Sequence, residues 1–213
     1  MTRAAAQRQL LLVALLALTA FGLLAVWAGT PSPASWEQGL VAALALGQDA
    51  WGALVRAVNT LGSPAIWAVL VVPIAAVMWR LQGRAAGILV ALTLASDLAA
   101  FGVKLLVGRE RPDTAATHYF FGPDAFSFPS GHVVRAVALA AVLAWLLAPA
   151  AWRLRGALFA ATGAWLVMAY ARVALGVHWP TDALGGALLG LAWFALTAAW
   201  LVPLGNQGKL SPS

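Results

Sequence analysis

The sequence predicts an all-α protein: an integral membrane bundle of six transmembrane helices with an amphipathic segment on the outer face. Of the 213 residues, 62% are hydrophobic and 9% are charged, whereas a soluble domain is roughly half apolar and a quarter charged. Six apolar stretches approach the roughly 20 residues that a helix needs to cross a bilayer core. Basic residues gather in alternate connections between these stretches, which is typical of a multi-pass membrane protein.

The expected spans cover 10–28, 62–79, 85–107, 130–148, 156–175 and 180–202. The second is short and contains Pro73, which predicts a kink or an extension beyond the apolar stretch. The first follows two arginines, so a cleaved signal peptide is the alternative interpretation. Its apolar core is longer than in signal peptides and AVWAGTPSPAS is a weak cleavage site, which favours an uncleaved anchor.

The basic residues also predict an orientation. Seven of them fall on one side of six spans, namely Arg3, Arg8, Arg80, Arg84, Arg153, Arg155 and Lys209. That side should be cytoplasmic, with both termini, if the chain lies in the cell inner membrane. We expect one domain over 1–205 and a disordered cytoplasmic tail over 206–213. Arg56, Arg109 and Arg111 fall on the opposite side and need another explanation.

The segment from 30 to 61 is apolar but interrupted by Glu37, Gln48, Asp49 and Arg56. It predicts one or two amphipathic helices lying on the outer interface. A lid or a lateral entrance is the functional interpretation, and simple interfacial packing is the alternative.

Composition excludes several classes of protein. The absence of cysteine excludes disulfides, thiolate catalysis and cysteine-ligated metal clusters. The net charge is +6, but the basic residues are dispersed and not interleaved with aromatic residues, so no nucleic acid partner is expected. The sequence does not determine the oligomeric state.

Three polar clusters lie near the outer ends of three different spans. KLLVGRERP contains Lys104 and Arg111, PSGH covers 129–132, and RVALGVHWPTD contains Arg172 and His178. Because consecutive spans run in opposite directions, the topology should bring these clusters to one depth on one face.

These residue types suit a multiply charged oxyanion such as phosphate. Lys104, Arg111 and Arg172 are three cations, and arginine offers forked donors to phosphate oxygens. Ser130 is a good N-cap for the fourth span. The unpaired N–H groups of Gly131 and the following residue would then form an anion site at the positive end of a helix.

Two histidines direct this anion site towards catalysis. His178 and Asp182 are four residues apart, so the carboxylate can bond one imidazole nitrogen and leave the other free to attack phosphorus. His132, on another helix, could protonate the leaving oxygen. Phosphoryl transfer needs little beyond positioning and charge stabilisation, so no metal or other cofactor is predicted.

The patterns Lys-x6-Arg-Pro, Pro-Ser-Gly-His and Arg-x5-His-x3-Asp, in this order, resemble the three motifs of the type 2 phosphatidic acid phosphatase superfamily. That family includes membrane lipid phosphatases and vanadium-dependent haloperoxidases, and the resemblance covers about 60–202. It implies a phosphohistidine intermediate on His178, with Asp182 orienting and His132 as the general acid. It also implies that phosphate is held by Lys104, Arg111, Ser130, Gly131 and Arg172. Ala171 stands where the third motif usually has serine.

Asp97 and Arg135 are ionisable residues within the expected third and fourth spans. An unpaired charge at that depth is costly, so we expect these two to pair as structural support, with Arg135 bridging towards the site. His118 matches no motif and is expected to be a solvated loop residue. Arg109, Glu110 and Asp113 would belong either to a substrate-facing rim or to a solvated loop.

The resemblance implies a membrane lipid phosphatase whose site faces the periplasm or exterior, with membrane lipids as its surroundings and a lipid phosphate as its substrate. Among substrates, undecaprenyl pyrophosphate is the best expectation, and phosphatidylglycerophosphate or phosphatidate is the alternative. A non-catalytic lipid-phosphate binding or transport protein is the alternative of another class. A haloperoxidase would use the same pocket for vanadate, but the six spans oppose it.

Overall fold

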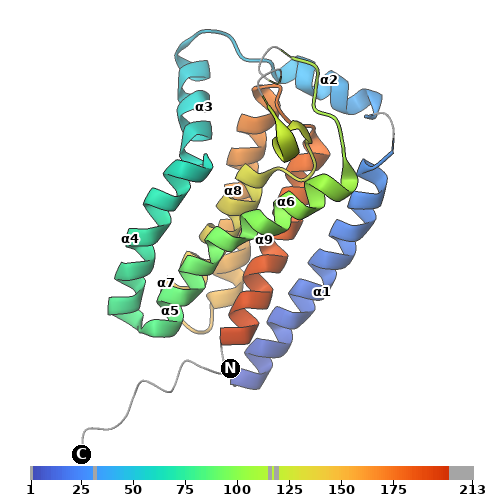
Figure 1. Cartoon of the computed structure of the whole chain (residues 1–213). Coiled ribbons are helices and arrows are strands. Elements are labelled where there is room, and N and C mark those ends of the chain that lie inside the picture. Colours follow the sequence, from blue (N-terminus) through green and yellow to red (C-terminus); the bar gives the residue numbers. More distant parts are fainter. Residues whose placement is uncertain (1, 31–32, 115–116, 118–119, 202–213) are drawn as a thin grey trace, which may run out of the picture.

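The computed structural model describes residues 2–30, 33–114, 117 and 120–201, which form an all-α bundle (Figure 1). Its longer elements are α1 (Arg3–Ala28), α2 (Ser35–Leu44), α3 (Ala50–Leu61), α4 (Pro64–Gln82), α5 (Arg84–Ala91), α6 (Ser96–Val107), α7 (Gly131–Leu147), α8 (Arg153–Ala174) and α9 (Pro180–Leu201). Two short 3₁₀ helices, η1 (Leu92–Ala95) and η2 (Gly122–Ala125), complete the order. The described residues contain no β-strand, only an isolated bridge between Glu110 and Phe126. His118 and the expected tail lie outside the described residues.

Five helical segments are long and apolar enough to cross a membrane: α1, α4, the continuous segment Arg84–Val107, α8 and α9. The predicted class, a helical membrane protein, is therefore confirmed. α7 has 17 residues, which corresponds to about 25 Å at 1.5 Å per residue and falls short of a core of about 30 Å. The six-span count thus stays a prediction.

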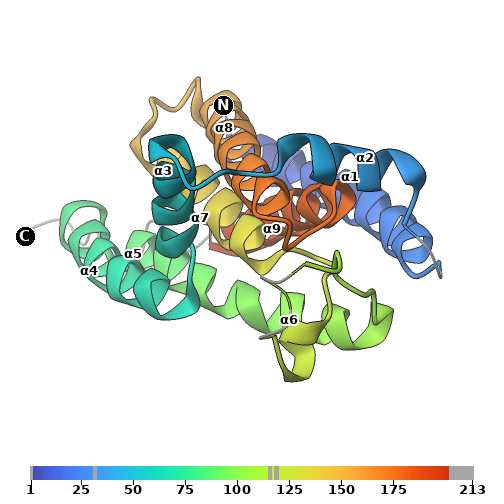
Figure 2. The same ribbon diagram turned by 90° about the horizontal axis from the view of Figure 1, so that it is seen from above.

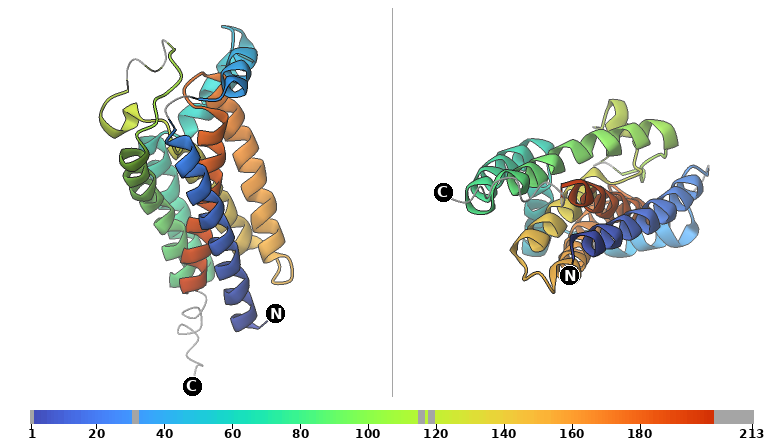
Figure 3. Two further views of the ribbon diagram at one scale, coloured as in Figure 1. Left: turned by 90° about the vertical axis from the view of Figure 1, so that its right-hand side faces the viewer. Right: turned by 90° about the horizontal axis from the view of Figure 1, so that it is seen from below.

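α7 is nevertheless central to the bundle. It packs most extensively against α8 and α9, and α1 covers the other side of α9 (Figure 3). Glycines on α9 permit this closeness, since a Cβ atom at Gly186 would lie 2.7 Å from the Ser130 carbonyl oxygen and one at Gly190 would lie 2.6 Å from that of Val134. Close approach through small residues is how membrane helices gain packing energy.

The segment from α4 to α6 forms a separate arm of the bundle (Figure 2). Pro73 lies inside α4, which continues to Gln82 and is longer than its apolar stretch. Between α5 and α6 the helix tightens into η1, a feature that often marks a change of direction. The indole of Trp193 on α9 donates to the carbonyl oxygen of Leu92 at 2.9 Å and attaches the arm to the core.

The segment predicted to be amphipathic forms two helices, α2 and α3, at one end of the bundle. This is the end where α6 finishes and where α7 and α9 begin, opposite the start of α1 (Figure 1). The side chain of Asp49 caps α3 by accepting from the N–H of Gly52 at 2.8 Å. α3 buries Gly52 and Val55, whereas Trp51 and Leu54 are exposed.

Candidate active site

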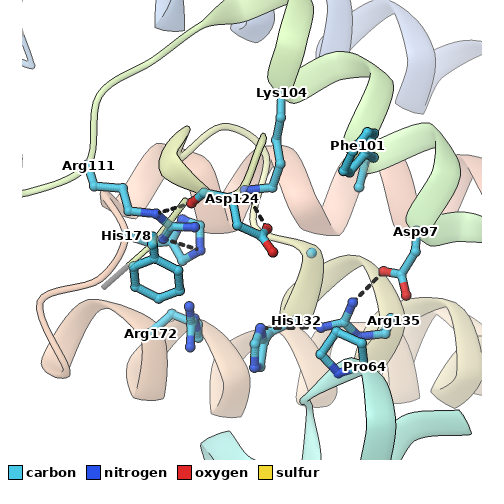
Figure 4. Close-up of a pocket in the computed structure, with 13 residues that line it drawn as sticks. Pro64, Asp97, Phe101, Lys104, Arg111, Asp124, His132, Arg135, Arg172 and His178 are labelled. Carbon is cyan, nitrogen blue, oxygen red and sulfur yellow. Dashed lines mark hydrogen bonds and ion pairs between the residues drawn. The ribbon is translucent and has the colours of Figure 1, made fainter. Parts of the chain in front are cut away.

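A pocket of about 280 Å³ opens at the end of the bundle that carries α2 and α3. Its walls come from α4, α6, α7, α8 and two connections, 108–130 and 175–179. Six of the residues predicted to be catalytic or phosphate-binding line it: Lys104, Arg111, Gly131, His132, Arg172 and His178. All of these except Gly131 are labelled in Figure 4. The structure therefore brings the three motifs into one cavity, as the topology predicts.

Ser130 and Asp182 lie behind the pocket wall. Ser130 is the N-cap residue of α7, as expected, but its side chain makes no cap hydrogen bond. Its Oγ is buried and has no hydrogen-bond partner among the described residues, whereas its N–H donates to the Asp182 carbonyl at 3.0 Å. A buried hydroxyl without a partner is costly, so the hydrogen-bonding capacity of this Oγ is not used by the described residues.

His178 is oriented through both ring nitrogens. Nδ1 lies 3.2 Å from Asp182 Oδ2, and Arg111 Nη1 lies 3.1 Å from Nε2. Because a guanidinium can only donate, Nε2 must be the acceptor, which assigns the proton to Nδ1. Burial, together with the charges of Arg111 and Arg172, keeps the pKa of His178 well below 6.5. The imidazole is thus neutral at physiological pH, with its Nε2 lone pair on the pocket side.

The neutral ring of His132 carries its proton on the other nitrogen from that of His178. Arg135 Nη2 lies 3.3 Å from His132 Nδ1, and the same donor argument leaves the proton of a neutral ring on Nε2. Gly62, at the end of α3, packs against this ring: a Cβ there would lie 2.7 Å from His132 Cδ2. The two neutral histidines therefore differ in tautomer: His178 has a lone pair at Nε2, whereas His132 has an N–H there.

Two cationic side chains of the pocket, Lys104 and Arg111, are held in position by hydrogen bonds to backbone carbonyl oxygens. Lys104 Nζ donates to the Phe126 carbonyl at 2.6 Å, and Arg111 Nε donates to that of Asp124 at 2.8 Å. The Asp124 carboxylate lies 3.8 Å from Lys104 Nζ at the pocket wall (Figure 4). Its side chain is 66% exposed, so solvent weakens this ion pair and a doubly charged phosphate could compete for the lysine.

Arg172 is almost completely buried. Its Nη1 donates to the side-chain oxygen of Asn59 on α3, while its Nε has no hydrogen-bond partner in the part of the chain that is described. Ala171, at the position where the family motif has serine, is buried and supplies no polar group. Asn59 is thus the side chain that holds the Arg172 guanidinium.

The expected pair of Asp97 and Arg135 is formed: Arg135 Nη1 donates to the Asp97 carboxylate. Arg135 also donates to the Gly62 carbonyl from Nε at 3.0 Å and from Nη2 at 2.6 Å. Both residues line the pocket, so they lie closer to the site than the sequence suggested. Arg135 links α6, α7 and the end of α3 behind His132.

Three residues at the site were not predicted from the sequence: Asn59, Glu37 and Arg109. Arg109, expected at a rim or in a solvated loop, is instead 8% exposed and forms ion pairs with Glu37 and Asp182. Arg109 is buried because its guanidinium lies between Glu37 on α2 and the start of α9. The signal that could have found Arg109 is its departure from the charge bias of the loops.

Comparison with known proteins agrees with this geometry. The model of the PAP2 superfamily matches residues 85–205. Lipid A 1-phosphatase from Rhizobium johnstonii is 41% identical over 125 residues, which is 55% of this chain and 48% of the relative, so the match spans about half of that protein. Phosphatidylglycerophosphatase B from Bacillus subtilis is 31% identical over 182 residues, 83% of this chain and 88% of the relative.

A solved structure extends the match to three dimensions. The transmembrane PAP2 type phosphatidylglycerolphosphate phosphatase from Bacillus subtilis superposes with a TM-score of 0.73 and 27% identity, over 88% of this chain and 94% of that chain. By class, the bundle and its pocket are those of a membrane phosphatase. The chain belongs to the PAP2 superfamily, whose model covers more than half of it.

Proposed function

We propose that this protein is a lipid phosphatase that works through a phosphohistidine intermediate without a metal ion. The observation that carries the proposal is the convergence of three cations and two histidines of opposite tautomer in one pocket. Multiple fixed donors stabilise the charge that develops on the transferred phosphoryl group. A binding or transport protein would have no use for the paired histidines.

When phosphate binds, Arg111 Nη1 exchanges its bond to His178 Nε2 for a phosphate oxygen, and Nε2 then forms a bond to phosphorus as the bond to the leaving oxygen breaks. The charge of the bound phosphate favours the protonated form of His132, which gives its Nε2 proton to that oxygen and becomes neutral, while Asp182 stabilises the charge on the His178 ring. Water then attacks the phosphohistidine, and His132 takes a proton back from this water. Phosphate leaves and both histidines return to their starting forms.

Lys104, Arg111 and Arg172 bind the phosphate oxygens in this proposal, together with Ser130 Oγ and the first N–H groups of α7. The support is chemical: two of the buried groups, Ser130 Oγ and Arg172 Nε, have no partner among the described residues. The first turn of a helix also leaves its N–H groups unpaired, and Gly131 lines the pocket.

Among lipids, we propose phosphatidylglycerophosphate as the first substrate to test, because the relatives that match most of this chain carry that activity in their names. Undecaprenyl pyrophosphate, the expectation from the sequence, is the second candidate, since the same pocket could bind a terminal phosphate. The proposed location is the cytoplasmic membrane with the site outside and the termini inside, supported by basic residues at the opposite end.

The test measures release of inorganic phosphate by the purified full chain in detergent with EDTA present. We expect activity, and we expect His178→Ala to abolish it while His118→Ala, a histidine outside the motifs, keeps it. A panel of phosphatidylglycerophosphate, undecaprenyl pyrophosphate, phosphatidate and lipid A, ranked by kcat/KM, identifies the substrate. Full activity in His178→Ala would refute the mechanism, and an inactive wild-type protein would refute the function.

A further inference from the structure

Arg109 lies outside the pocket, in the connection after α6, and is enclosed by protein. Its Nη1 donates to Asp182 Oδ1 at 2.7 Å and to Thr181 Oγ1 at 2.7 Å. Its Nη2 donates to Glu37 Oε2 at 2.6 Å. One planar guanidinium therefore connects the start of α9 with α2.

The two oxygens of Asp182 have separate partners. Oδ1 accepts from Arg109, while Oδ2 accepts from the Trp179 N–H at 2.8 Å and faces His178 Nδ1 at 3.2 Å. A carboxylate bonded on both oxygens cannot rotate without losing a bond. The direction in which Oδ2 meets His178 is thus set from the opposite side of the carboxylate.

Glu37 completes this arrangement from α2. Its side chain is fully buried, and Oε1 accepts from the Thr181 hydroxyl at 2.6 Å and from the Thr181 N–H at 3.3 Å. Its carboxylate therefore lies at the positive end of α9, where a negative charge is favourable. It also pairs with the Nη2 side of the Arg109 guanidinium, opposite the bond from Nη1 to Asp182.

We propose that Arg109 and Glu37 are positioning residues, which hold the Asp182 carboxylate against His178 and attach α2 to the reacting centre. The inference rests on the proposed function of His178 and Asp182. Arg109 touches neither the pocket nor a phosphate, so it acts through Asp182. The interfacial segment around α2 is consequently part of the active site's support.

The geometry requires arginine. Lysine has one ammonium group and cannot bond Asp182 and Glu37 from opposite ends of a planar fork. The rings of Trp27 and Trp179 also lie 5.5 Å and 5.9 Å from the Arg109 guanidinium carbon, at distances where aromatic faces attract a cation. Arg109→Lys should therefore restore only part of the activity lost in Arg109→Met.

The kinetic test separates turnover from binding. Arg109→Met should lower kcat by about 10- to 100-fold, as loss of a residue that orients a reactive ligand does in metal sites, with KM changed by less than about 3-fold. Arg111→Met, which removes a pocket cation, should instead raise KM. Glu37→Gln, which keeps the shape, should lower kcat by less than Arg109→Met. Arg56→Met is the matched control, because the Arg56 side chain donates to the Gly47 carbonyl and not to this network.

A double-mutant cycle shows through which residue Arg109 acts. In an Asp182→Ala background, which leaves Arg109 no acceptor at this position, Arg109→Met should lower kcat by no more than about 2-fold further, because its route to the reaction through Asp182 is already lost. Losses that multiply in the double variant, or a rise in KM with unchanged kcat, would overturn the proposal.

A spectroscopic measurement does not depend on activity. The chain has three histidines, so ¹⁵N-labelled histidine gives few signals, and His178→Ala assigns one ring. The wild-type spectrum should show His178 protonated at Nδ1 and strongly hydrogen-bonded, and this signal should be lost or become mixed in Arg109→Met and Glu37→Gln. An unchanged His178 signal in both variants refutes the positioning role, even if the wild-type protein proves inactive and the proposed function fails.

Discussion

Replacing Arg135 by methionine should destabilise the protein far more than neutralising its partner Asp97. Methionine keeps much of the aliphatic stem but loses the bonds to Asp97, His132 and the carbonyl of Gly62. Removing one partner of a buried ion pair costs about 3–5 kcal/mol. The Asp97 side chain is 35% exposed, so water compensates part of this cost and the lower end, about 3 kcal/mol, applies.

Asp97→Asn is the matched perturbation. The amide oxygen can still accept from Arg135, which also keeps both bonds to Gly62, so the expected loss is about 1 kcal/mol. Since about 1 kcal/mol moves Tm by roughly 2–4 °C at this chain length, Tm should fall by roughly 6–12 °C in Arg135→Met and roughly 2–4 °C in Asp97→Asn.

Thermal unfolding in detergent, followed by the fluorescence of the 11 tryptophans, measures both shifts. Equal shifts in the two variants, or an unchanged Tm in Arg135→Met, would refute the role assigned to Arg135. Charge reversal is an independent check: Asp97→Arg and Arg135→Asp should each be defective, and the double variant should recover part of the loss.

Two further predictions concern the ligand-facing groups. Ser130→Ala should leave Tm unchanged or raise it, because Oγ is buried without a partner among the described residues. KM should rise, because one proposed phosphate contact is lost. A fall in Tm with unchanged KM would contradict this prediction. His178 must be neutral to attack, and burial with the nearby arginines lowers its pKa, so kcat/KM should stay constant down to about pH 6.5 and fall only below it. Folded-state stability should decline over the same acidic range, because the unfolded chain binds a proton at His178 near pH 6.5 and the native state resists that proton. A fall of kcat/KM that already begins above pH 6.5 would contradict the neutral state assigned to His178.

The sequence by itself determined the membrane class and the helices that position the site. Hydrophobic length predicts the five longest helical segments, because only a helix satisfies its backbone in lipid. The alternating direction of the spans then predicts that Lys104, His132 and His178 meet. The i to i+4 spacing also predicts the contact between His178 and Asp182, since a helical turn brings such residues to one face.

Tertiary structure decided the contacts that join distant parts of the chain. Glu37 and Arg109 are 72 residues apart and Asn59 and Arg172 are 113 apart. No local periodicity relates residues so far apart. From the sequence, the apolar segment 30–61 could therefore have been a lid or lateral entrance, or could simply have packed at the interface. Arg109 is buried because its side chain bonds residues of α2 and α9, which lie far from it in the sequence. The sequence could therefore predict most of the charged residues that line the pocket, while only the folded chain identifies the residues that hold Asp182 and Arg172 in position.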